Sequence, residues 1–117
     1  MMPSPSRGEV WLVDLNPTRG QEIRKTRPVI VISSDLFSQI SVRIAIPVTS
    51  WQEKFRDRPF MIKIPADSQT GLNQPSAGNV LQIRSLSTER FIKRLGAVTP
   101  AVMNELLATL AVCTDYL

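Results

Sequence analysis

The chain has 117 residues, of which 43% are hydrophobic and 21% are charged. These proportions are ordinary for a folded protein, and the length suits one domain with a single core. Lysine and arginine number 14 against 10 acidic residues, so the formal net charge is +4. A moderately basic domain suits a polyanionic partner such as nucleic acid, although many basic proteins bind none.

Histidine is absent, and Cys113 is the only cysteine. These two facts exclude a disulfide within the chain, a cysteine-based zinc site, and the Ser-His-Asp and Cys-His nucleophile arrangements. Acid–base chemistry must therefore use Asp, Glu, Lys, Arg, Tyr or water. No tight cluster of carboxylates compensates for the missing ligands, so we expect neither a metal nor another cofactor.

Residues 1–6 contain two prolines and two serines and are expected to form a flexible tail, followed by a single domain over residues 7–117. The first eight residues lack the apolar centre of a signal peptide. No apolar run is long enough to span a membrane. We therefore expect a cytoplasmic protein without a membrane partner.

The first two strands are the clearest elements of the pattern. Residues 10–15 predict a strand with Trp11 and Val13 on one face. After a polar loop, residues 28–33 form an almost continuous β-branched run, which is typical of a strand covered on both faces. Ser34 and Asp35 then cap one helical turn or begin an ordinary loop, and the sequence leaves both interpretations open.

The rest of the chain predicts further short strands and one terminal helix. Strands are expected at residues 42–48, 60–64, 79–85 and 94–98, with a polar loop at 51–58, a connection at 67–78 and a short helix beginning near Ser87. Thr99 as N-cap and Pro100 at the first helical position predict a helix that ends near Cys113. Its apolar face would comprise Val102, Leu106, Leu110 and Cys113. Together these elements predict a mainly β fold with some α structure, namely a compact, partly open β-barrel with a packed helix.

The polar loop between the first two strands is the strongest candidate for a functional site. Residues 16–28 carry four of the 14 basic residues and one carboxylate, Glu22. Glu22 and Arg27 would suit phosphate chemistry, because a carboxylate can take a proton while a guanidinium holds an anionic centre. The alternative is an ordinary solvated loop, which composition alone would favour.

Several motifs together resemble the opening of the MazF/PemK (Kid) family of toxin endoribonucleases. They are RGEVWLVDLNPTRGQE at residues 7–22, RPVIVIS at 27–33, IPVTS at 46–50 and VLQIRSL at 80–86. The resemblance extends from Arg7 to the C-terminal helix. It implies an SH3-like barrel of the plasmid-toxin type. It also implies the toxin of a type II toxin–antitoxin system, which cleaves single-stranded mRNA at specific sequences through 2′-hydroxyl attack. The family further implies a cognate antitoxin and a homodimer.

The same resemblance assigns roles to individual residues. Glu22 matches the general-base glutamate of the family, Arg27 its catalytic arginine, and Thr49 the threonine after the third strand. Kid-type members carry an Asp before the glutamine of the fifth strand and a His near the first loop. Here Leu81 stands in the first position and histidine is absent, so only the MazF-type set is available. The residues expected to contact RNA are Arg19, Arg24, Lys25, Ser50, Lys54, Arg56, Gln82 and Arg84.

Two other functions are compatible with this fold. One is a gyrase-poisoning toxin similar to CcdB, which binds protein and cuts nothing; the other is a non-catalytic RNA-binding module. Retention of Glu22, Arg27 and Thr49 together favours the nuclease. Trp11, in mid-strand, is expected in the core, whereas Trp51 could lie at the core edge or stack on a base.

Overall fold

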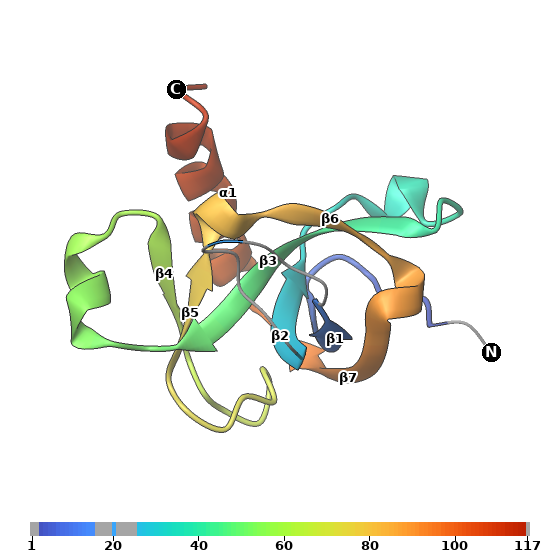
Figure 1. The fold of residues 1–117 in the computed structure, drawn as a ribbon, viewed down its shortest axis with the longest axis horizontal. Coiled ribbons are helices and arrows are strands. Elements are labelled where there is room, and N and C mark those ends of the chain that lie inside the picture. The colour runs from blue at the N-terminus through green and yellow to red at the C-terminus, as the bar shows by residue number, and fades with distance from the viewer. Residues whose placement is uncertain (1–2, 16–19, 21–25, 117) are drawn as a thin grey trace.

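The computed structural model describes residues 3–15, 20 and 26–116. In this part of the chain, seven antiparallel strands form a sheet in the order β4-β5-β3-β2-β1-β7, with β6 pairing with β3 (Figure 1). The sheet is not closed, and one helix follows it, so the predicted fold class is confirmed. The elements are β1 (Glu9–Asp14), β2 (Thr26–Val31), β3 (Val42–Ser50), β4 (Met61–Ile64), β5 (Ser76–Asn79), β6 (Arg84–Ser87), β7 (Phe91–Ala97) and α1 (Pro100–Cys113).

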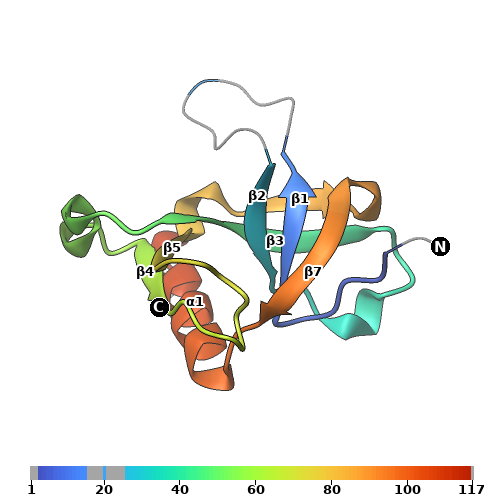
Figure 2. The same cartoon turned by 90° about the horizontal axis from the view of Figure 1, so that it is seen from below.

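Strand β2 separates two hydrophobic cores, as its β-branched run predicts. Ile30 packs into a core that the sheet shares with α1, whereas Val29 and Val31 point into the second core, on the other face. All three side chains are fully buried. Because successive strand residues alternate in direction, an uninterrupted apolar run is what a strand covered on both faces requires. Figure 2 shows α1 on the side of β4 and β5, away from β1 and β7.

Helix α1 begins and ends where its capping residues predict. The Thr99 hydroxyl oxygen accepts a hydrogen bond from the Val102 amide at 3.2 Å, and Pro100 occupies the first helical position. Leu106 is fully buried, and Met103, which the predicted face omitted, is 6% exposed. No helix in the described part of the chain is long and apolar enough to cross a membrane.

The prediction of a strand at 79–85 is wrong. A 3₁₀ turn, η3 (Val80–Gln82), separates β5 from β6 there. The last residues of the expected connection instead form β5, whose Gly78 lies under the helix. A Cβ on Gly78 would lie 3.2 Å from Leu106 Cδ2. Small residues are thus what lets α1 approach this strand, although in the sequence they resemble a loop.

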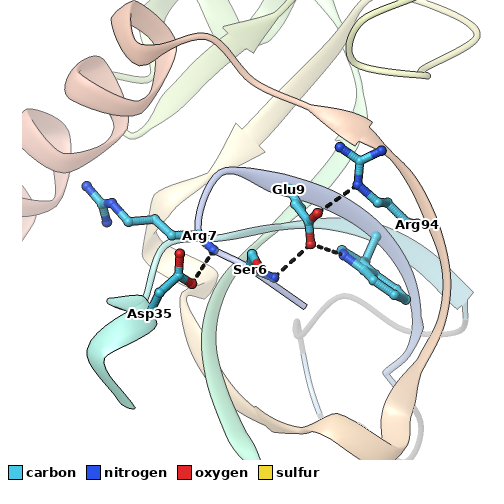
Figure 3. Close-up of polar contacts among 6 residues, drawn as sticks. Ser6, Arg7, Glu9, Asp35 and Arg94 are labelled. Atoms are coloured by element: carbon cyan, nitrogen blue, oxygen red, sulfur yellow. Dashed lines mark hydrogen bonds and ion pairs between the residues drawn. The ribbon is translucent and has the colours of Figure 1, made fainter. Parts of the chain in front are cut away.

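The N-terminal segment is joined to the sheet by polar contacts. Pro5, within the expected tail, is buried, and its carbonyl accepts a hydrogen bond from Arg43 Nε at 2.8 Å. The Glu9 carboxylate accepts hydrogen bonds from the Ser6 amide and from Arg94 Nε on β7 (Figure 3). It also accepts one from Trp11 Nε1. Partial burial raises the pKa of Glu9, but these hydrogen bonds and the Arg94 charge outweigh it, so the pKa lies below its ordinary value.

Candidate functional site

A pocket of about 350 Å³ lies where β2 and β3 meet the loop formed by residues 65–75. Its apolar lining includes leucines from β1, β7 and the loop. Its polar groups come from the adjacent ends of β2 and β3 and from the loop. The lining residues are Leu12, Thr26, Arg27, Pro28, Val48, Thr49, Ser50, Gly71, Leu72, Asn73, Gln74, Ser76 and Leu95.

Arg27 lines this pocket from β2, where its backbone pairs with Val13 of β1. Its Nε atom is buried and has no hydrogen-bond partner among residues 3–15, 20 and 26–116. A buried donor without an acceptor destabilises a folded protein by roughly 1–3 kcal/mol. A guanidinium that lines a pocket and has an unsatisfied donor is well suited to an anionic ligand, which offers acceptors to it.

Thr49 and Ser50 lie at the end of β3, where their backbones pair with Ala77 and Ser76 of β5. Both are half-buried, and both line the pocket together with Arg27. The structure thus brings together three of the residues that the sequence selects. The Ser50 hydroxyl oxygen accepts a hydrogen bond from Gln74 Nε2 at 2.6 Å.

Asn73 and Gln74 line the same pocket but are not among the residues that the sequence predicts. Both belong to the stretch predicted only as a connection. A single sequence carries no signal for them, because loop residues lack the periodicity that assigns a strand or helix residue to a face. The direction in which they point depends on the docking of the loop onto β7.

Four of the other candidate RNA contacts do not line this pocket. Lys54 and Arg56 are exposed in the 3₁₀ helix η2 (Glu53–Asp57), within the predicted polar loop. Arg56 forms an ion pair with Glu53 at 2.9 Å. Gln82 ends η3, and Arg84 begins β6 opposite Ala45.

The two tryptophans have partners within the protein. Trp11 packs edge-on against Phe91, with ring centroids 5.9 Å apart, as its expected core role requires. Trp51 packs against Phe55 and has the Lys63 ammonium 5.2 Å from its ring centroid. These contacts favour the core-edge interpretation of Trp51 over base stacking.

Four candidates lie outside the described residues: Arg19, Glu22, Arg24 and Lys25. Their roles stay predictions. The described residues contain no group of three or more His, Cys, Asp or Glu side chains that could hold a metal ion.

Comparison with known proteins gives consistent matches over most of the chain. Residues 6–114 match the family described as PemK-like, MazF-like toxin of type II toxin-antitoxin system. The chain is 37% identical over 106 residues to Endoribonuclease MazF9 of Mycobacterium tuberculosis, with 86% of this chain and 87% of that protein covered.

Two solved structures show the same fold. One is MazF from Deinococcus radiodurans, with a TM-score of 0.82, 23% identity, and coverage of 97% of this chain and 98% of the other. The other is an endoribonuclease in complex with its cognate antitoxin from a mycobacterial species. It has a TM-score of 0.70 and 25% identity, with 97% and 96% of the two chains covered.

Proposed function

Because the chain belongs to the PemK-like, MazF-like toxin family of type II toxin–antitoxin systems, we propose that it is an endoribonuclease that cuts single-stranded mRNA. The observation that carries this proposal is that Arg27, whose buried Nε has no hydrogen-bond partner among the described residues, lines the same pocket as Thr49. A guanidinium and a hydroxyl that line one pocket suit a phosphate, which offers only acceptors. A relative that aligns over most of the chain is named an endoribonuclease.

RNA carries its own nucleophile, so the protein needs to supply only proton transfer and charge stabilisation. The 2′-hydroxyl oxygen attacks the adjacent phosphorus as its proton passes to Glu22, the proposed general base. Arg27 and Thr49 stabilise the extra negative charge on the non-bridging oxygens. The bond from phosphorus to the 5′-oxygen then breaks, and the leaving oxygen takes up a proton from water. The products are a 2′,3′-cyclic phosphate and a 5′-hydroxyl, with no metal in the mechanism.

A cognate antitoxin is the second partner that we propose, since a structural relative is described in complex with one. An acidic segment that folds on binding would compete with RNA for the same cations, with apolar side chains supplying most of the affinity. Charge reversal at Lys25, Lys54 and Arg56 should then weaken binding of both the antitoxin peptide and RNA. Simultaneous binding of peptide and RNA, unaffected by these changes, would place the antitoxin on another surface. A homodimer is proposed from the family alone.

The proposed activity is tested by incubating single-stranded RNA with the purified chain in excess EDTA. Wild type should cut the RNA, and Arg27→Ala should be slower by about 10²–10³, the usual loss when one oxyanion donor is removed. Arg94→Ala is the matched control, because this arginine contacts Glu9 and does not line the pocket. Absence of cleavage by wild type, or equal rates for wild type and Arg27→Ala, would contradict the proposal.

A further inference from the structure

The loop formed by residues 65–75 is fixed by its own hydrogen bonds. The Asp67 carboxylate accepts from the amides of Gln69 and Thr70, at 2.9 and 2.8 Å. Thr70 is 3% exposed, and its hydroxyl donates to the Pro65 carbonyl at 2.9 Å. A polar side chain buried in this way holds the turn in one conformation, because breaking its hydrogen bonds would leave desolvated groups unpaired.

Two glycines then dock the loop against β7 (Figure 2). Gly71 has φ +73°, and a Cβ there would lie 2.0 Å from the Leu95 carbonyl oxygen. A Cβ on Gly96 would lie 2.3 Å from the Gln69 carbonyl oxygen, which itself accepts from the Ala97 amide at 2.9 Å. Such a close approach of two backbones is possible only without side chains. The loop is therefore a preorganised wall of the pocket.

This wall ends in Gln74, whose side chain reaches the end of β3. Its Nε2 donates to Ser50 Oγ at 2.6 Å, and its remaining N–H and its carbonyl oxygen make no other hydrogen bond within the described chain. The Ser50 hydroxyl keeps its own hydrogen to donate. The pair therefore presents two donors and one acceptor side by side. A phosphate has no use for the acceptor, whereas the Watson–Crick edge of a base offers both donors and acceptors.

The apolar part of the pocket suits the flat face of a base. Leu12, Leu72 and Leu95 line it from three different segments, beside Pro28. Buried apolar contact with a few directed polar groups is how proteins commonly hold planar ligands. Arg27 supplies the positive charge of the pocket, so phosphate binding and base reading fall to different residues.

We propose that Gln74, held by Ser50, reads one unpaired base of the RNA next to the cut site and is a specificity-determining residue. This inference rests on the proposed ribonuclease function. It assigns sequence selection to the fixed loop at 65–75, and it leaves charge stabilisation to Arg27 and Thr49. Base discrimination by a paired donor and acceptor is commonly about 10- to 100-fold, so the effect of removing it is measurable.

The test measures kcat/KM on a panel of short RNAs that vary one base at a time around the preferred cut site. Gln74→Ala should lower kcat/KM by about 10- to 100-fold on the preferred RNA and much less on the others, so that one position of the RNA loses its base preference. Gln74→Glu keeps the shape but replaces the donor by an acceptor, and should shift the preference toward bases that present a donor. The matched control is Gln69→Ala, whose exposed side chain lies in the same loop and outside the pocket.

The outcomes separate this inference from the function on which it rests. Cleavage by Gln74→Ala and Gln74→Glu with the wild-type order of preference would overturn the inference and leave the nuclease intact. An equal loss on every RNA would also overturn it, because it would place Gln74 in charge stabilisation or folding. If wild type cuts no RNA of the panel, the proposed function itself fails, and the inference falls with it.

Discussion

Substitution by methionine should change the stability of the protein in opposite directions at Arg27, which is half-buried, and at Arg43, which is buried. Methionine keeps the length of the aliphatic stem but removes the guanidinium. Arg27 Nε is buried and has no hydrogen-bond partner in the part of the chain that the structure describes. Arg43, in contrast, is 5% exposed and donates to the carbonyls of Pro5, Ser38, Ile40 and Val42. Arg27→Met therefore removes an unsatisfied hydrogen-bond donor. Arg43→Met instead removes the donors that four backbone carbonyls use.

The magnitudes follow from these two hydrogen-bond inventories. Relief of one desolvated donor should stabilise Arg27→Met by about 1 kcal/mol. Loss of the donors of Arg43 should destabilise by about 3 kcal/mol, because at least one acceptor, the Pro5 carbonyl, belongs to a buried residue. For a domain of this size, 1 kcal/mol corresponds to about 4 °C in Tm. We therefore expect Tm to rise by about 4 °C in Arg27→Met and to fall by about 12 °C in Arg43→Met.

Calorimetry of wild type and both variants at neutral pH measures these shifts, and an RNA cleavage assay on the same samples measures activity. Arg27→Met should gain stability while losing about 10²–10³ in kcat, which is the pattern of a side chain kept for a ligand. A Tm that falls in Arg27→Met as far as in Arg43→Met would refute the reasoning. It would show that Arg27 is a structural residue with an unrecognised partner in the folded protein.

Glu9→Gln should destabilise the fold by roughly 1–2 kcal/mol at pH 7, because the ionised carboxylate accepts three hydrogen bonds. Folding lowers the pKa of Glu9, so the difference in Tm between wild type and Glu9→Gln should be complete above the ordinary glutamate pKa. It should disappear as the pH falls through the lowered pKa, and a difference that stays constant down to acid pH would contradict this prediction. Gly71→Ala should lower both Tm and kcat/KM, because a Cβ at φ +73° would meet the Leu95 carbonyl; Gly20→Ala, with φ +62° but no atom near its Cβ among the described residues, should lower Tm less, and an equal fall would argue against the clash. Thr99→Ala should lower Tm by about 4 °C through loss of the α1 N-cap, whereas Thr99→Ser should not, and equal losses would argue against the cap.

The parts of the fold that the sequence predicts well are those in which local preference and burial agree. β2 is apolar throughout because both of its faces are covered, and α1 begins at a threonine and proline that favour a helix start. The prediction of a strand at 79–85 was wrong because Val80, Leu81 and Ile83 are residue types that favour strands. In the structure Val80 is buried at a turn, and Leu81 is 55% exposed.

The residues of the candidate site also fall into a predictable and an unpredictable group. Arg27, Thr49 and Ser50 were predictable because they stand at the ends of well-defined strands within family motifs. Gln74 was not, because its position depends on the contact of its loop with Leu95 and Gly96 of β7, which are more than 20 residues away in the sequence. A loop of mostly polar residues has many local conformations, and its internal hydrogen bonds together with the docking onto β7 select one.

The most direct test of the account is cleavage of an RNA that carries a single 2′-deoxy sugar at the cut position, in the presence of EDTA. The 2′-hydroxyl mechanism predicts that this bond resists cleavage. It also predicts that the unmodified RNA gives a 2′,3′-cyclic phosphate and a 5′-hydroxyl, which mass spectrometry of the products can identify. Efficient cutting at the deoxy position, or a strict requirement for added divalent metal, would contradict the mechanism.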